Sequence, residues 1–382
     1  MTTSELTTRS AASISALFDA GYMSKLILLL CLVSGSVLGQ DSEYSAGQPR
    51  INLPIEVLMG FNLVNLTDVN EKEETIDFEG AIYLEWDDPT QTYAPENYGM
   101  REEWTPGDYS RAPKQIYLGD FAVKENFEGW RPHVVIPNGI GDRAITNMGI
   151  SVWPDGHVAY SETFYAKVEV PMDLRKYPFD TQDLEIFFHP FIYQRDELIL
   201  IPDDRLAGTW DQNMGIADWS RESVSMNERS TRIAYFDDSE SEISEFVVTL
   251  QIKRKPAHLM ISIVLPMLLL VSLTWCVFWI NEDTLSNRIN VTFIGILSVV
   301  AYYFVILDNV PAVDYLTLID AFVIATFLIL AAGVVVIVLM ESMISRYGKA
   351  VGVRIDRICR WAFPVGYVLI TMALAGIFFS LY

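Results

Sequence analysis

The chain shows two patterns of apolar and polar residues, which divide near Pro256. Before that point, apolar and polar residues alternate over short runs, as in residues 81–86 and 246–252. Alternation with a period of two predicts half-buried strands of an antiparallel sheet. No amphipathic helical pattern separates these runs, which disfavours a parallel sheet with crossover helices. We therefore expect residues 41–255 to form an antiparallel β-sandwich.

After Pro256 the pattern changes to long apolar stretches without charges. There are four of them, at residues 259–280, 289–307, 321–340 and 361–382. About 20 apolar residues in a helix match the hydrocarbon thickness of a bilayer, which is roughly 30 Å. We expect residues 256–382 to be a transmembrane four-helix bundle, with spans near 257–280, 285–307, 315–340 and 360–382.

The first residues have the pattern of a targeting segment. Lys25 precedes a short apolar run, and small residues follow it up to Gly39. This predicts a signal sequence over residues 1–40, cleaved near Gly39 or Gln40. Met23 is an alternative start, which would leave residues 1–22 untranslated. A lipid anchor on Cys31 is disfavoured because the preceding Leu30 is not small.

Acidic residues gather in the exported part. Residues 41–255 hold 40 Asp and Glu against 19 Lys and Arg, in a chain whose formal net charge is −22. Such a surface repels nucleic acid and attracts cations. We expect no nucleic-acid partner, and calcium, protons and amines remain as classes of ligand.

The charges between the spans predict orientation. Residues 341–360 carry five Lys and Arg against two acids. Cytoplasmic loops are enriched in basic residues, so this segment is expected inside and both the sandwich and the C-terminus outside. The prediction is a multi-pass protein of the cell membrane, with a periplasmic domain if the cell is Gram-negative.

Motifs of catalysis are missing from the sequence. It contains neither G-x-S-x-G nor H-E-x-x-H, and its four histidines have no metal-binding spacing. We therefore expect neither an enzyme nor a cofactor. Carboxylate pairs such as Asp87-Asp88 leave a calcium site open, although solvated turn charges explain them better. The exported part has no cysteine, so it must hold together without disulfides.

Residues 170–184 read VPMDLRKYPFDTQDL and resemble the signature loop of Cys-loop receptors, the pentameric ligand-gated ion channels. The aromatic-Pro-aromatic-Asp core at residues 177–180 carries the resemblance. The two cysteines of the family would fall at Val170 and Leu184, so the disulfide is absent, as in the bacterial branch. The resemblance implies that packing alone closes this loop.

Further marks of this family follow in order along the chain, at residues 68–72, 86–88, 130–132, 253–256 and Pro266. The resemblance implies a homopentamer around a central pore, which a small ligand or a proton opens from the outer domain. A membrane-anchored binding or adhesion protein is the alternative from another class. It is disfavoured because one anchor would have sufficed.

One stripe of the second span is expected to line the pore. Residues spaced by alternating steps of four and three fall on one helical face: Asn290, Ile294, Leu297, Ala301, Phe304 and Asp308. In a ring of subunits, Leu297 and Phe304 become apolar collars that dewet and close the pore. The acidic outer end favours cations, although Asn287 stands where many cation-selective relatives carry a glutamate.

The resemblance also assigns a ligand site between neighbouring subunits. It implies an aromatic cage for an ammonium, with Tyr83 compensating for the small Ala81: the residues are Phe191, Tyr193, Tyr235, Phe246 and Tyr83. Sandwich-core positions are the alternative for Phe246 and, less so, for Tyr235. The agonist stays open between an amine and a proton, with calcium as a possible modulator.

Three charges fall on the loops that the resemblance brings to the membrane surface, namely Glu71, Asp180 and Arg254. We expect Arg254 to be buried between the two carboxylates. Their loops would push on the segment near Pro311 and tilt the pore helix between closed and open arrangements.

Overall fold

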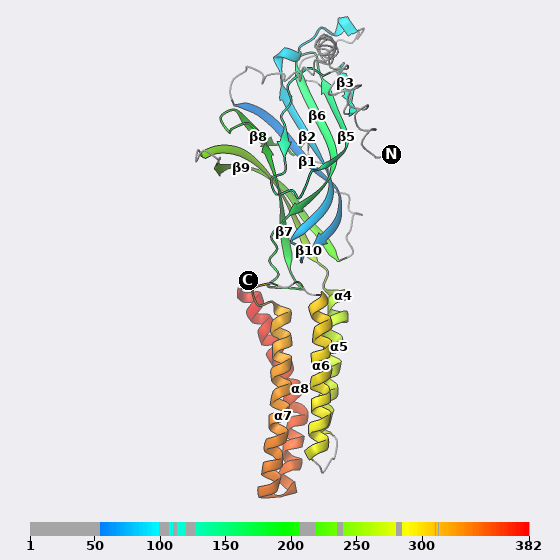
Figure 1. The fold of residues 1–382 in the computed structure, drawn as a ribbon, viewed down its shortest axis with the longest axis vertical. Coiled ribbons are helices and arrows are strands. Elements are labelled where there is room, and N and C mark those ends of the chain that lie inside the picture. Colours follow the sequence, from blue (N-terminus) through cyan, green and yellow to red (C-terminus); the bar gives the residue numbers. More distant parts are fainter. Residues whose placement is uncertain are drawn as a thin grey trace, which may run out of the picture. The chain divides into compact units, whose positions relative to one another are not determined.

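The computed structural model describes residues 54–98, 107, 109, 113–119, 127–206, 218–234, 240–279, 285–309, 311 and 313–381. The expected leader at residues 1–40 lies outside these ranges. Strands fill the first part of the described chain and helices the second (Figure 1). The strands are β1 (Ile55–Asn70), β2 (Thr75–Asp87), β3 (Gln115–Leu118), β4 (Val134–Val135), β5 (Ala144–Val152), β6 (His157–Glu169), β7 (Thr181–Pro190), β8 (Leu198–Pro202), β9 (Trp219–Ala234) and β10 (Glu240–Arg254).

The strands form two sheets, ordered β3-β5-β6-β2-β1-β8 and β4-β7-β10-β9. This is the expected β-sandwich, with one departure from a purely antiparallel arrangement. Strand β8 pairs with the start of β1 in parallel, Ile55 opposite Leu198 and Met59 opposite Pro202. The chain leaves the second sheet after β7 and joins the edge of the first as β8, and this change of sheet gives β8 the same direction as β1.

The sandwich core is built on phenylalanines from both sheets. Phe188 of β7 packs against Phe61 of β1 at 5.8 Å between ring centroids and against Phe246 of β10 at 6.1 Å. All three are at most 1% exposed. Burying one such side chain contributes about 1.5–3 kcal/mol. The core therefore supplies the stability that a chain without disulfides in this domain requires.

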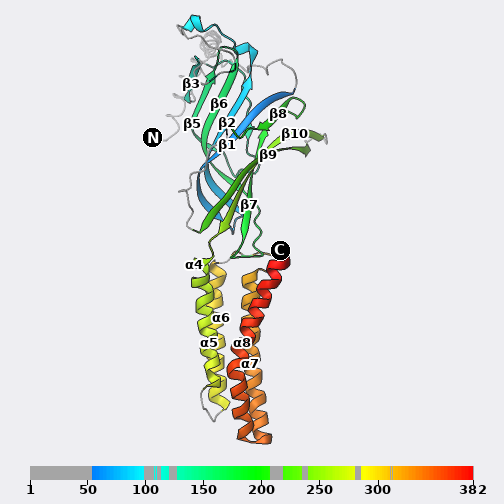
Figure 2. The same ribbon diagram turned by 180° about the vertical axis from the view of Figure 1, so that it is seen from behind.

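The helical part contains four helices long and apolar enough to cross a membrane (Figure 2). The first span is made of α4 (Ala257–Leu259), a π-helical turn (Met260–Val264), α5 (Leu265–Trp275) and a 3-10 turn (Cys276–Phe278). The others are α6 (Leu285–Asn309), α7 (Leu318–Tyr347) and α8 (Lys349–Leu381).

The irregular turn in the first span follows from a proline. Pro266 has no amide hydrogen, so the carbonyl of Ser262, four residues earlier, lacks its α-helical donor. The hydroxyl of Tyr302 on α6 donates a hydrogen bond to this carbonyl. The pore helix expected from the sequence is thus tied to the first span where that span is irregular.

Two helix ends differ from the expectation. Helix α7 begins at Leu318 rather than near 315, because Thr317 and Asp320 form a reciprocal capping box. The link expected at residues 341–360 is almost entirely helical: α7 continues to Tyr347, α8 begins at Lys349, and Gly348 between them has φ 86°. Charged residues end an apolar span but do not end a helix, whereas a glycine with positive φ does.

Candidate functional site

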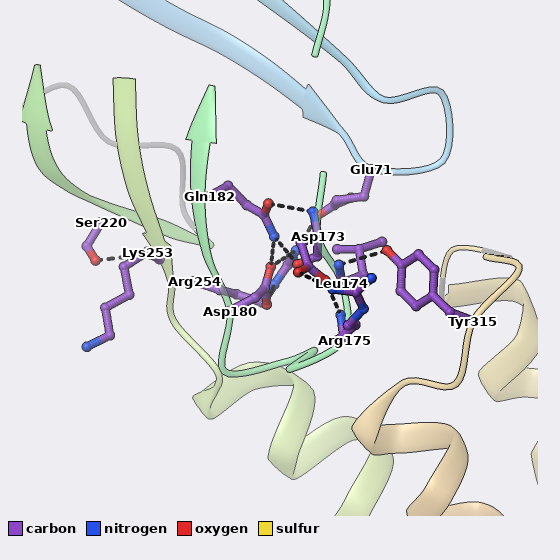
Figure 3. A network of polar contacts seen from close by, with 10 residues as sticks. All are labelled: Glu71, Asp173, Leu174, Arg175, Asp180, Gln182, Ser220, Lys253, Arg254 and Tyr315. Carbon is purple, nitrogen blue, oxygen red and sulfur yellow. Dashed lines mark hydrogen bonds and ion pairs between the residues drawn. The ribbon is translucent and has the colours of Figure 1, made fainter. Parts of the chain in front are cut away.

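A buried network of polar contacts surrounds Arg254, the last residue of β10 (Figure 3). Its Nε donates to Oδ1 of Asp180 at 2.8 Å, its Nη2 to Oδ2 of Asp180 at 3.2 Å and its Nη1 to Oε1 of Glu71 at 2.6 Å. Arg254 is 4% exposed and Asp180 2%. The structure thus brings together the three charges that were selected from the sequence.

Strand pairing explains how these charges meet. Antiparallel β10 and β7 run side by side up to Lys253 opposite Thr181, and the next backbone contact joins the amide of Arg254 to the carbonyl of Asp180 at 3.1 Å. On the other side, Arg254 is opposite Trp219 of β9. The ladder therefore places the arginine and its aspartate at the same end of one sheet.

Aromatic rings complete the surroundings of the guanidinium. Its central carbon lies 4.1 Å from the ring centroid of Trp219 and 4.6 Å from that of Tyr177. Burial would lower the pKa of Arg254, but the hydrogen bonds and charges of Asp180 and Glu71 outweigh burial and raise that pKa above its ordinary value. Arg254 is therefore charged, and its charge is compensated by carboxylates and ring faces.

The signature loop is closed by more than packing. Val170 and Leu184, at the positions of the missing cysteines, are each 0% exposed. In addition, the Gln182 side chain accepts from the amide of Asp173 at 3.0 Å and donates to the Asp173 carbonyl at 2.8 Å. The side-chain Nε2 of Gln182 also donates to Oδ2 of Asp180 at 2.7 Å. Gln182 thus bridges both arms of the loop.

Tyr315, just before α7, joins the signature loop to the helices. Its hydroxyl accepts from the amide of Leu174 at 3.0 Å and donates to the carbonyl of Met172 at 3.3 Å. The amide of Leu318, at the start of α7, donates to the carbonyl of Arg175 at 2.9 Å. A lone tyrosine in a loop gives no periodic signal, so sequence reasoning missed Tyr315. Pro311 is buried, and its contribution to coupling remains a prediction.

The expected pore stripe lies on the exposed face of α6. Ile294, Leu297 and Phe304 are 66%, 67% and 63% exposed in the single chain, and Asn290 and Ala301 are also exposed. The opposite face is buried: Val299 is 0% and Ile306 3% exposed. Asp308 lies on α6, but its side chain is outside the described part. The apolar stripe is therefore not used to pack this helix within its own subunit.

The residues that the resemblance assigned to a ligand site do not form one cluster within the single chain. Tyr193 accepts a hydrogen bond from Nε1 of Trp130 at 2.8 Å, and the two rings meet edge to face at 5.8 Å. Phe191 is 63% exposed and lies 5.4 Å from the ring of His133. Trp130, in one of the segments that carried the family resemblance, was not selected from the sequence.

The remaining aromatics of that set lie elsewhere. Phe246 is 0% exposed and packs on Phe188 in the core, so its ring is not available to a ligand. Its place in a strand that alternates toward the core is the physical reason. Tyr83 lies half-buried on β2 of the other sheet, and Tyr235 lies outside the described residues.

The acidic pairs in turns make local contacts. Asp87 accepts from Nδ1 of His157 at 2.8 Å, and the side chain of Asp88 caps the turn at Thr90. Asp203 pairs with Arg205. In the described part of the chain, no group of three or more His, Cys, Asp and Glu residues is placed to hold a metal ion.

Comparison with known proteins shows to which family the chain belongs. The model of the neurotransmitter-gated ion-channel ligand binding domain matches residues 44–256. A proton-gated ion channel of Gloeobacter violaceus is 27% identical over 349 residues, which are 91% of this chain and 89% of that protein.

Animal receptor subunits are similar at lower identity. A gamma-aminobutyric acid receptor subunit beta of Lymnaea stagnalis is 22% identical over 287 residues, and a neuronal acetylcholine receptor subunit beta-2 of Carassius auratus is 24% identical over 285. Each alignment covers 73% of this chain, which spans about half the length of these two subunits, 54% and 56%.

The family match covers more than half of the chain and ends at Pro256, where the strands give way to the spans. The relatives extend the similarity into the four helices. The chain therefore belongs to the family of neurotransmitter-gated ion channels and is a ligand-gated channel subunit, with an extracellular β-sandwich and four membrane-spanning helices.

Proposed function

We propose that identical copies of this chain form a pentamer in which α6 lines a cation-preferring pore, opened by a small ligand or a proton acting on the sandwich. One observation carries the proposal: the exposed stripe of α6 is apolar in its middle, with Leu297 67% and Phe304 63% exposed. An exposed apolar face on a span can lie against lipid, against a neighbouring subunit or along a lumen. The polar Asn290, exposed on the same stripe, favours the lumen, and a ring of subunits around a central axis would provide it.

The apolar stripe accounts for closure. Leu297 of every subunit would form a ring whose methyl groups cannot replace the hydration shell of an ion. Phe304 would add a second ring two turns further along the helix. A narrow apolar ring excludes water, so the pore closes without a separate plug.

Cation preference is supported by the charge of the outer domain. The excess of acids in residues 41–255 raises the local concentration of cations at an extracellular entrance. The described stripe residues, from Asn290 to Phe304, include no basic side chain. The relative from Gloeobacter violaceus is named as a proton-gated channel, which supports a proton as a stimulus.

An amine is the other stimulus that specific residues support. Tyr193 and Trp130 form an aromatic pair, with exposed Phe191 nearby in the chain, and aromatic faces attract ammonium groups with about 0.5–2 kcal/mol per contact. In either case the stimulus would reach the pore through the Arg254 network and Tyr315, which contact the signature loop from the sandwich and from the helices.

Recording from the purified protein in a planar bilayer tests the proposal. A sodium chloride gradient is applied, and pH steps and a panel of amines are tried in turn. We expect gated currents that reverse near the sodium potential. Reversal near the chloride potential would rule out cation preference, and the absence of currents under every stimulus would contradict the channel as proposed.

A further inference from the structure

A buried ion pair fastens the inner end of α6 to α8. Nη1 of Arg288 lies 2.7 Å from Oδ1 of Asp356, and Nη2 lies 2.9 Å from Oδ2. Both residues are only 8% exposed, and Met340 of α7 lies 3.8 Å from the same guanidinium. Two parallel hydrogen bonds of this kind fix the orientation of both groups.

The pair holds the charge of Arg288 on the back of the pore helix. Residues two apart on an α-helix point about 200° apart, so Arg288 and Asn290 face opposite sides. Asn290 is exposed on the proposed pore stripe, whereas Thr292, one turn after Arg288, is 2% exposed and lies on the same buried face as Arg288. The arginine is thus next to the pore entrance in sequence but directed away from it.

The same face of α8 also holds the end of the first span. Arg360 lies one turn after Asp356, and its Nε donates to the carbonyl of Phe278 at 2.7 Å. The ring of Phe278 stacks on Phe363 at 5.1 Å. On α8, Asp356 therefore holds the start of α6 and Arg360 holds the end of the first span.

This geometry has an electrostatic consequence for the pore. An arginine at the inner end of α6 would be repeated in every subunit, and a ring of guanidinium groups would repel cations and attract anions. A carboxylate in two-point contact compensates that charge. A buried guanidinium deprived of this carboxylate gains by moving to water, and the aqueous inner mouth lies at the same end of α6.

We propose that Asp356 of α8 is a selectivity-determining residue of the channel: it holds Arg288 behind the pore helix and keeps a ring of positive charge away from the inner mouth. Arg360 fastens the first span to the same helix face through the carbonyl of Phe278, and this contact is separate from the ion pair. This inference rests on the proposed function, in which α6 lines a cation-preferring pore.

Reversal potentials of the full-length channel in a sodium chloride gradient test the proposal. Asp356→Asn keeps the shape of the side chain and removes its charge. We expect the permeability ratio of sodium over chloride to fall by about threefold or more, because the charge of Arg288 is no longer compensated. The double variant Asp356→Asn with Arg288→Gln removes both charges and should return the ratio to that of the parent.

Arg360→Met is the matched control. It removes the other contact of the same helix face but leaves the ion pair, so it should alter gating or surface expression without moving the reversal potential. A merely structural role of Asp356 predicts the same behaviour for Asp356→Asn. An unchanged reversal potential in Asp356→Asn, or a double variant that stays shifted, would overturn the proposal.

If channels made only of Asp356→Asn subunits do not reach the surface, coexpression with the parent keeps the test decisive. Incorporation is verified by a tag on the altered subunit. The reversal potential should then move toward chloride in proportion to the incorporated variant, and no movement would refute the inference. A parent channel that is silent or anion-preferring would instead refute the proposed function.

Discussion

The guanidinium of Arg254 holds the carboxylate of Asp180 through two hydrogen bonds, at 2.8 and 3.2 Å, while both residues are almost completely buried. Asp180 belongs to the signature loop, and only two residues separate Arg254 from the first span, which begins at Ala257. The pair is therefore a short link between the part of the chain that receives a stimulus and the part that carries the pore.

Removing the guanidinium should uncouple the two parts. Arg254→Ala leaves the buried carboxylate of Asp180 and the partly buried carboxylate of Glu71 without their cation. Deleting one partner of a buried pair costs about 3–5 kcal/mol. We expect maximal currents to fall far more than ligand affinity, measured by whole-cell recording and binding on the same cells. Currents that are unchanged at equal surface expression would show that the network does not couple.

Arg254→Lys separates charge from geometry. It keeps one positive charge but cannot make the two-point contact with Asp180 or the flat contact with Trp219. We expect intermediate currents, between those of the parent and of Arg254→Ala. A lysine variant equal to the parent would mean that charge alone suffices.

The hydroxyl of Tyr315 should matter for the midpoint of gating. Tyr315→Phe keeps the ring and removes contacts to Leu174 and Met172 on the signature loop. One neutral hydrogen bond is worth about 1 kcal/mol, which corresponds to a factor of about five, so the loss of both bonds should change the half-activating stimulus by about fivefold or more. Tyr303→Phe is the matched control, because the Tyr303 ring packs on Phe327 of α7 rather than on the sandwich.

Polar substitution of the apolar collar should favour opening. Leu297→Thr places hydroxyl groups where a methyl ring excludes water, so hydration of the closed pore becomes less unfavourable. We expect spontaneous openings and a half-activating stimulus reduced by about tenfold or more. Val299→Thr, on the buried face of α6, should not produce openings without stimulus. Equal effects of the two variants would contradict the assignment of the stripe.

Glu245 predicts a pH dependence of stability. Burial would raise the pKa of its carboxyl, but hydrogen bonds from His189, Arg229 and Thr231 outweigh burial and hold that pKa below its ordinary value. A lowered pKa in the folded state stabilises the protein at pH values above the ordinary pKa of about 4.3. This stabilisation is lost as the pH falls through the lowered value.

Thermal unfolding midpoints measured at several pH values test whether the stabilisation by Glu245 is lost as the pH falls. Glu245→Gln should be less stable than the parent at pH 7, and the difference should shrink as the pH falls below about 4. Glu242→Gln is the control, since the Glu242 side chain is 54% exposed and its contact with Arg232 is worth little. A difference for Glu245→Gln that is constant with pH would contradict the assigned protonation.

The sequence predicted the sandwich and the spans because their periods are local. Alternation specifies strands such as β10, and long apolar runs specify helices such as α6. The same reasoning could not separate a core ring from a pocket ring. Phe246 lies in a central strand, paired with β7 on one side and with β9 on the other, and its side chain is 0% exposed. Family resemblance supplied the loops that bring Glu71, Asp180 and Arg254 together.

Contacts between segments distant in the sequence could not be predicted from it for a different reason. Tyr315 sits in a loop without periodicity, and the partner of Arg288 is a lone aspartate on another helix. Neither residue stands out by spacing or composition. The helical link around Gly348 lies outside the predicted spans, because charges bounded those spans and charge marks the end of an apolar stretch rather than the end of a helix.

The central claim is that α6 lines the pore with one face, and cysteine accessibility along this helix tests it most directly. Single cysteines are placed in a background without Cys31, Cys276 and Cys359, and a water-soluble cationic thiol reagent is applied to open channels. We predict irreversible block at exposed-face positions such as Asn290, Ile294 and Leu297, and none at Thr292 or Val299. Equal modification of both faces, or block at the buried face alone, would contradict the account.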